Sequence, residues 1–356
     1  MSSSSHTVSR WPHRFAVLLT CATFPLIWVG GLVTTYDAGM AVEDWPSTYG
    51  YNLFLYPWKT WLFGPFDLFI EHGHRLMGAL AGMLTIALLV VVWLSDRRTW
   101  MKWVGVTALC AVIGQGLLGG MRVLFDDRQL AMIHGCVGPA FFAFTVAICS
   151  FTSKFWRDED RRVVERDETL GRSLAQTALL TLCFSYIQLA LGASLRHLPI
   201  DATVAYFRGA VVFHLLMAAV VTFHVIALAN MAWNRRIGPG FRGPTAVLVG
   251  AIVVQLLLGG GTWIVKYGWP EWVADTSWAA GYTIQTNSLS QALTVTAHVA
   301  NGSLILAMAT LVSVRACRAF PLLADETRAA RRGQLHSNKT TDRGETSSNL
   351  IGKPVA

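Results

Sequence analysis

Four histidines share one sequence pattern and are the best candidates for chemistry in this chain. Each is followed four positions later by a small residue, in the segments HRLMG, HGCVG, HLLMA and HVANG. Residues four positions apart lie on the same face of a helix, so each imidazole would have open space beside it. An imidazole within an apolar membrane helix is costly unless it is paired or bound to a ligand. These histidines are His74, His134, His214 and His298.

The pattern favours haem as the ligand. Haem iron takes axial histidine nitrogens, and small residues let a broad, flat ring approach a helix closely. Four ligands make two bis-histidine sites, one in each half of the chain. A hydrogen bond between helices is the alternative for any single histidine. Zinc or copper is the alternative for the set, although a single tetrahedral histidine site does not require four small residues.

One carboxylate breaks the symmetry between the halves. Glu71 lies three residues before His74, whereas the other three histidines have Ala131, Val211 and Val295 at that offset. A carboxylate beside one haem is suited to act as a general base or proton carrier. The alternatives are a favourable charge at a helix N-terminus or a simple pair with an arginine four residues later. Because bis-histidine ligation fills both axial sites, each haem either carries electrons or is itself altered at its edge.

A second repeat alternates with the first along the chain. Gln115, Gln188 and Gln255 are each followed four positions later by a glycine, and the first apolar segment has Leu26 before Gly30. Close packing of helices is sufficient to explain this motif.

Two arginines follow these glycine motifs. Arg122 and Arg196 are candidates to bind haem propionates as bidentate partners. Extension of the side chains to lipid headgroups is an equally good explanation.

The elements that position these residues are predicted to be membrane helices. Of the 356 residues, 53% are hydrophobic and only 14% are charged, and the mean hydropathy is +0.44. These values exclude a disordered chain, a coiled coil and an ordinary soluble enzyme. We predict an all-α integral membrane protein with eight transmembrane helices in two pseudo-symmetric four-helix bundles. The expected spans are 15–35, 72–94, 103–122, 130–152, 173–195, 208–231, 243–265 and 290–314.

The charge distribution predicts the orientation. All but seven of the 29 lysines and arginines lie in the tails and in the loops on one side, so both termini are expected in the cytoplasm of a bacterial-type cell membrane, with the histidines toward the outer side. The net charge of +8 reflects this topology and is no sign of nucleic-acid binding. The expected domains are an N-tail (1–14), a first bundle (15–152), a cytoplasmic linker (153–172), a second bundle (173–315) and a disordered cytoplasmic tail (316–356).

With these residues in place, the sequence resembles the haem A synthase family over about residues 15–315. The resemblance rests on GGLVTTYDAGMAVEDWPSTYGYN after the first span, EHGHRLMG, IHGCVGPAFF and TVTAHVANGSLILA. It implies an eight-helix membrane oxidase that converts the C8 methyl of haem O to the formyl of haem A for aa3-type terminal oxidases. It implies a catalytic role for Glu71, substrate-haem ligation by His74 and His134, and haem b ligation by His214 and His298.

The resemblance also implies partners and has one departure. A haem O synthase, an electron acceptor and a second copy of the chain are the expected partners, besides the lipid bilayer. Some family members have a cysteine pair in the first outer loop, but residues 36–71 contain no cysteine. A mechanism that depends on a loop thiol is therefore not expected here.

Two other functional classes are consistent with eight helices. A di-haem electron carrier that reacts with quinone would use the same ligands, although haems that carry electrons across a membrane usually lie near both faces. A transporter would be built from a parallel repeat, but the sequence has no pair of proline-interrupted helices at the midplane.

Overall fold

The computed structural model describes residues 9–157, 167–199, 201–277 and 279–322. Within these residues the protein is all-α, with eight helices long and apolar enough to cross a membrane. This confirms the predicted fold class. The eight helices are α1 (Trp11–Thr35), α3 (Phe66–Ser95), α4 (Thr99–Leu124), α5 (Arg128–Thr152), α7 (Glu168–Arg196), α8 (Val204–Trp233), α9 (Arg242–Tyr267) and α11 (Leu289–Ala319).

Four of the long helices begin at a polar side chain that caps them. Asp127, Asp167, Thr203 and Ser288 each accept a hydrogen bond from a backbone N–H in the first turn of α5, α7, α8 and α11. Such caps satisfy backbone donors that the helix itself leaves unpaired. Three of these four helices bear a candidate histidine, so the caps fix the starting points from which the histidines are positioned.

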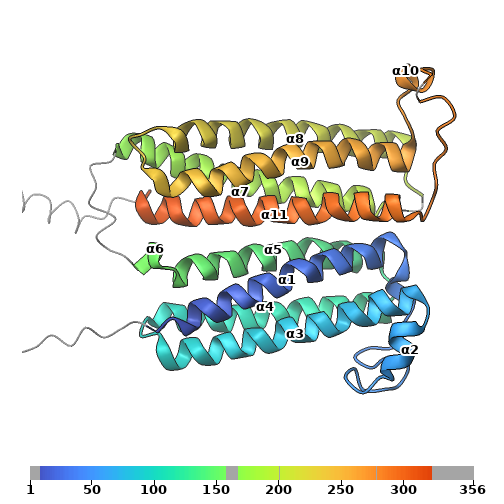
Figure 1. Ribbon diagram of the computed structural model, residues 1–356, viewed down its shortest axis with the longest axis horizontal. Helices are drawn as coiled ribbons and strands as arrows, with labels where there is room; N and C mark the ends of the chain where they lie inside the picture. Colours follow the sequence, from blue (N-terminus) through green and yellow to red (C-terminus); the bar gives the residue numbers. More distant parts are fainter. Residues whose placement is uncertain (1–8, 158–166, 200, 278, 323–356) are drawn as a thin grey trace, which may run out of the picture.

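The helices form two groups (Figure 1). Helices α1, α3, α4 and α5 pack in a ring, and α7, α8, α9 and α11 pack in a second ring. Each group has its own buried apolar cluster. The groups meet where α11 contacts α1 and α5, and where α5 contacts α7. The pseudo-symmetry of the two bundles stays a prediction, as do the domain limits, and the tail from 323 lies outside the described residues.

Short elements lie at the two ends of the molecule (Figure 1). One end has the two long loops, which contain η1 (Ala38–Met40), α2 (Trp58–Phe63) and α10 (Glu271–Ala274). The other end has α6 (Lys154–Arg157), η3 (Pro239–Phe241), the start of α1 and the end of α11. Both ends of the described chain therefore lie on the same side, as an even number of spans requires.

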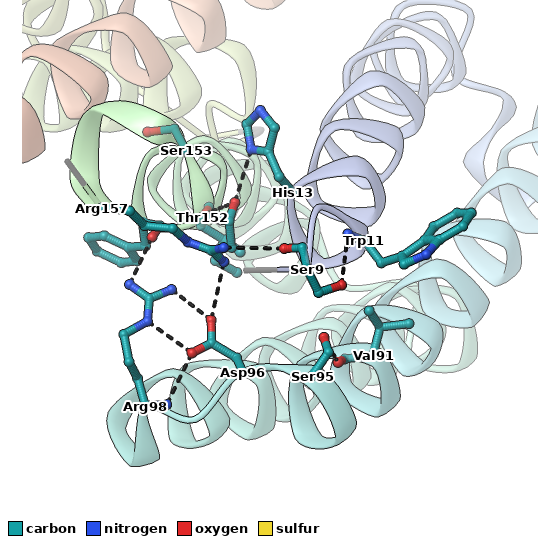
Figure 2. Close-up of polar contacts among 12 residues, drawn as sticks. Ser9, Trp11, His13, Val91, Ser95, Asp96, Arg98, Thr152, Ser153 and Arg157 are labelled. Atoms are coloured by element: carbon teal, nitrogen blue, oxygen red, sulfur yellow. Dashed lines mark hydrogen bonds and ion pairs between the residues drawn. The ribbon is translucent and has the colours of Figure 1, made fainter. Parts of the chain in front are cut away.

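A polar network joins the elements at the α6 end (Figure 2). The Asp96 carboxylate accepts hydrogen bonds from Arg98 at 2.9 and 2.7 Å and from Arg157 at 3.4 Å. Arg157 also donates to the backbone oxygen of Ser9, at 3.2 Å. Burial alone would raise the pKa of Asp96, but the hydrogen bonds and charge of Arg98, aided by Arg157, hold that pKa below its ordinary value.

Candidate functional site

The histidines of the N-terminal bundle face one another. The ring centroids of His74 on α3 and His134 on α5 are 6.3 Å apart, and the ring planes are inclined at 83°. The two residues lie eight and six positions after the first residue of their helices. At a rise of 1.5 Å per residue, they are about 12 and 9 Å along the helix axes.

The histidines of the C-terminal bundle form a second pair. The ring centroids of His214 on α8 and His298 on α11 are 6.4 Å apart, with planes inclined at 64°. These residues lie ten and nine positions into their helices, or about 15 and 14 Å along the axes. Because α3, α5, α8 and α11 all begin at the end with the long loops, both pairs lie at a similar depth (Figure 1).

Both pairs have the ring separation expected of two histidines that share one iron. Two iron–nitrogen bonds of about 2.0 Å, each with about 1.1 Å from nitrogen to ring centre, require about 6.2 Å between centroids. The buried Nδ1 atoms of His74, His214 and His298 have no hydrogen-bond partner within the described residues. No group of three or more His, Cys, Asp or Glu side chains is gathered in this part of the chain, so neither pair has the further ligands of a tetrahedral zinc site.

One cavity connects the two pairs. It has a volume of about 500 Å³ and is lined by all four histidines, and by the three glutamines of the second repeat. The volume lies in the range of small-molecule binding sites. The glutamine amides contact the histidines. Gln115 donates to the backbone oxygen of His134 at 2.9 Å, and Nε2 of Gln188 and Gln255 lies 3.2 and 3.5 Å from Nε2 of His214 and His298.

Glu71 is buried in the cavity wall beside His74. Its residue exposure is 1%. One carboxylate oxygen accepts a hydrogen bond from Arg75 at 2.7 Å, and the other accepts one from the backbone N–H of Val42 at 2.9 Å. Glu71, Arg75 and His74 all line the cavity. The structure thus brings the carboxylate to the first histidine pair, and it also forms the pair with Arg75 that the four-residue spacing allows.

Arg75 also holds the first outer loop over the N-terminal bundle. Its guanidinium donates to the backbone oxygens of Asp44 at 2.6 Å, Ser47 at 2.8 Å and Val42 at 2.6 Å. Sequence reasoning missed this role, because carbonyl acceptors far along the chain leave no sequence signal. The loop residues that reach the cavity are Trp45, Pro46 and Leu53.

The two arginine candidates differ in their surroundings. Arg122 lines the cavity, and its guanidinium makes no hydrogen bond or ion pair within the described residues. Arg196 also lines the cavity, but it donates to the backbone oxygen of Gly31 at 2.7 Å and to Thr35 Oγ1 at 2.6 Å. Arg196 therefore connects α7 of one bundle to α1 of the other.

A further histidine at the cavity was not predicted. His197 follows the last residue of α7 and lines the cavity, although it lacks the small residue four positions later. Burial, followed by the positive charges of Arg196 and Arg122, lowers the pKa of His197 to about 4. Its imidazole is therefore neutral at pH 7.

Fold and site together define a multi-pass membrane protein with two histidine pairs on one internal cavity. Comparison with known proteins gives the family. The profile of the COX15-CtaA family, described as cytochrome oxidase assembly protein, matches residues 13–212. This match covers more than half of the chain, and the chain belongs to this family.

Individual relatives agree with the family. The chain is 25% identical over 275 residues to the haem A synthase of an Exiguobacterium species, covering 73% of this chain and 85% of the relative. It is 24% identical over 188 residues to the haem A synthase of Shouchella clausii, covering 52% of this chain and 58% of the relative. It is 29% identical over 182 residues to that of Symbiobacterium thermophilum, covering 49% of this chain and 55% of the relative. The chain thus spans little more than half the length of two of these relatives.

Proposed function

We propose that this chain acts as a haem A synthase, a membrane enzyme that oxidises the C8 methyl of haem O to a formyl group by successive hydroxylations and loss of water. The observation that carries the proposal is the presence of two histidine pairs on one cavity, each with the ring separation of a bis-histidine iron. The family and the curated relatives support it.

The two pairs are proposed to have different occupants. His74 and His134 would hold the substrate haem O, and His214 and His298 would hold haem b. Haem b, when bound, supplies a one-electron redox centre beside the substrate site. The assignment is supported by Glu71, which lines the cavity next to His74, whereas Val211 and Val295 stand at the same offset in the other half.

Glu71 is the proposed catalytic residue, acting as a general base or proton carrier at the edge of the substrate. The hydrogen bonds from Arg75 and Val42 fix the orientation of its carboxylate. Each carboxylate oxygen has a second lone pair beyond these two bonds, so the group retains the capacity to accept a proton.

The arginines are proposed to bind propionates. Within the described residues the Arg122 guanidinium makes no hydrogen bond, and it lines the cavity, which suits a bidentate contact with a carboxylate. Arg196 has donors beyond those used by Gly31 and Thr35 and is proposed to contact a propionate through them.

The first outer loop is proposed to exclude water from the substrate. Trp45, Pro46 and Leu53 line the cavity in the half that would hold haem O. A closed site strengthens electrostatic interactions and prevents side reactions. The proposal uses no thiol of this loop, because residues 36–71 contain no cysteine.

The setting is proposed to be a bacterial-type cell membrane. The excess of lysine and arginine on one side supports cytoplasmic termini and haem sites near the outer surface. A haem O synthase and an electron acceptor are the proposed partners, with a homo-oligomer as a further proposal. Haem A would pass to aa3-type oxidases. The proposed substrate-haem and haem b domains are 15–152 and 173–315.

The function is tested by its product. The chain is co-expressed with a haem O synthase in a host that lacks haem A, and the extracted haems are separated by chromatography. We expect a haem A peak. Haem B and haem O alone would instead favour a di-haem electron carrier, the alternative that the family does not support.

A further inference from the structure

Each of the four imidazoles lies against a glycine on the neighbouring helix. A Cβ atom added to any of these glycines would meet the ring, and the nearest ring atom is Cε1 in every case. The distances to Cε1 are 2.8 Å for Gly30 against His74, 2.9 Å for Gly119 against His134, 3.2 Å for Gly192 against His214, and 3.3 Å for Gly259 against His298.

These glycines are the ones that the second sequence repeat contains. Three of them stand four residues after a glutamine, and Gly30 stands four residues after Leu26. Other glycines on the same helices behave differently. A Cβ on Gly114, Gly116 or Gly250 would have no atom within 4 Å. Contact with an imidazole is therefore a property of one position in each repeat and not of helix glycines in general.

The contact restricts the ring physically. Because glycine has no side chain, the edge of the ring packs directly on the helix backbone. The groups around a ligating histidine set the orientation of its ring and its tautomer. The ring planes are inclined at a large angle in both pairs, 83° in the N-terminal bundle and 64° in the C-terminal bundle.

We propose that Gly30, Gly119, Gly192 and Gly259 are positioning residues, here called glycine seats, that fix the planes of the axial imidazoles. The inference rests on the haem ligation proposed above. Real Cβ contacts are essentially never shorter than 3.0 Å, so a methyl group at either N-terminal seat would force the imidazole to shift. The two C-terminal seats would admit one if the ring moved by a few tenths of an ångström.

The seats predict a graded response to alanine. Gly259→Ala is expected to keep its haem b, but the rotated ring should shift the low-field electron paramagnetic resonance signal of that ferric haem, which depends on the angle between axial ring planes. Gly119→Ala is expected to lower occupancy of the N-terminal site by about tenfold or more, as other changes around metal-ligating histidines do. The holoprotein is purified after co-expression with a haem O synthase, and haem content and resonance spectra are measured.

Matched controls separate the seats from general helix damage. Gly114→Ala lies on α4 with Gly119, and Gly250→Ala lies on α9 with Gly259, and both place the methyl group in open space. We expect both controls to retain the parental spectra and haem content. Equal changes in the controls and the seat variants would overturn the proposal, and so would unchanged spectra in both seat variants. Gly259→Ala keeps the test decisive if Gly119→Ala fails to fold.

The outcomes also distinguish the proposal of haem ligation by the four histidines from the proposal of the glycine seats. If the parental protein shows two low-spin haem signals and the seat variants match it, the seats fail and the ligation stands. If the parental protein shows no low-spin signal, the ligation by the four histidines fails, and the seats fail with it.

Discussion

The two bundles hold nearly identical histidine pairs in different surroundings. The ring separations are 6.3 and 6.4 Å, but the glycine seats are tighter in the N-terminal bundle. Among the described residues, only the N-terminal bundle places a buried carboxylate and residues of a long outer loop at the cavity, whereas the C-terminal bundle adds His197 at the end of α7. The histidine and glycine repeats are what the two halves share, so the ligation proposed for both halves would need only these repeats. The added groups of the N-terminal bundle suit the chemistry proposed for that half.

Helix α1 connects the two sites. Gly30 faces His74 within its own bundle, while a Cβ on Gly31 would lie 2.8 Å from the side chain of Thr296 on α11. Thr296 stands two residues before His298, and its hydroxyl lies 3.3 Å from that of Thr35. A displacement of α1 would therefore reach ligand candidates in both halves.

The largest expected effect is the loss of a haem ligand. His298→Ala should remove the low-spin haem b signal and the activity, because an iron in the C-terminal pair would lose one of its two protein ligands. The measurement is the absorption spectrum of the purified protein. His224→Ala, on the same helix as His214, is the control, since the His224 ring is hydrogen-bonded within its own helix, to the Val220 oxygen at 2.8 Å. A full complement of low-spin haem b in His298→Ala would contradict the assignment.

The next largest effect is expected at Glu71, the carboxylate that distinguishes the N-terminal half from the C-terminal half. Glu71→Gln should leave both haems bound and lower the yield of haem A by about a hundredfold or more, the range for loss of a general base. Chromatography of extracted haems measures the yield, and Asp67→Asn, an exposed carboxylate on the same helix, is the control. Unchanged haem A output from Glu71→Gln would eliminate its catalytic role.

A smaller effect is expected from the two long outer loops, of which only the first contributes residues to the cavity lining within the described chain. Trp45→Ala removes a ring that lines the cavity and packs against Gly120, so haem A yield should fall on the order of tenfold while the haem b spectrum is retained. Trp272→Ala, in the second outer loop, should have no effect because its side chain is 83% exposed. Equal losses of haem A yield in Trp45→Ala and Trp272→Ala would contradict the proposal that the first outer loop alone covers the substrate.

The smallest effect concerns stability and pH at the α6 end. The folded pKa of Asp96 lies below its unfolded value, so its contribution is complete above the unfolded pKa, about 4, and is lost as pH falls through the folded pKa. Asp96→Asn should lower the free energy of unfolding by about 1.5–3 kcal/mol at pH 7. It should also make that free energy less dependent on pH below about pH 4. Asp167→Asn is the counterpart in the other bundle, where the partner Arg236 is 75% exposed, and should change stability less. Thermal unfolding in detergent across pH measures both.

Much of the architecture could be predicted because it depends on local composition. Eight apolar segments each satisfy their backbone hydrogen bonds internally, so length and hydropathy suffice to identify them. The histidine repeat could be recognised for a similar reason, because residues four positions apart lie on the same face of any helix. The pair of Glu71 and Arg75 follows this rule as well.

Only the tertiary structure decided what surrounds those positions. The glycine motif indicates close packing, but the identity of the packed group, an imidazole at each of the four seats, depends on which helices are neighbours. The sequence predicts that Arg196 binds propionates or headgroups. Its hydrogen bond to the backbone oxygen of Gly31 on α1, in the other bundle, depends on how the helices pack. The loop held by Arg75 and the cavity-lining Trp45 likewise depend on contacts between distant segments. Sequence determines which residues share a helix face, whereas the partner of that face is set by how whole helices pack, and no local pattern contains that information.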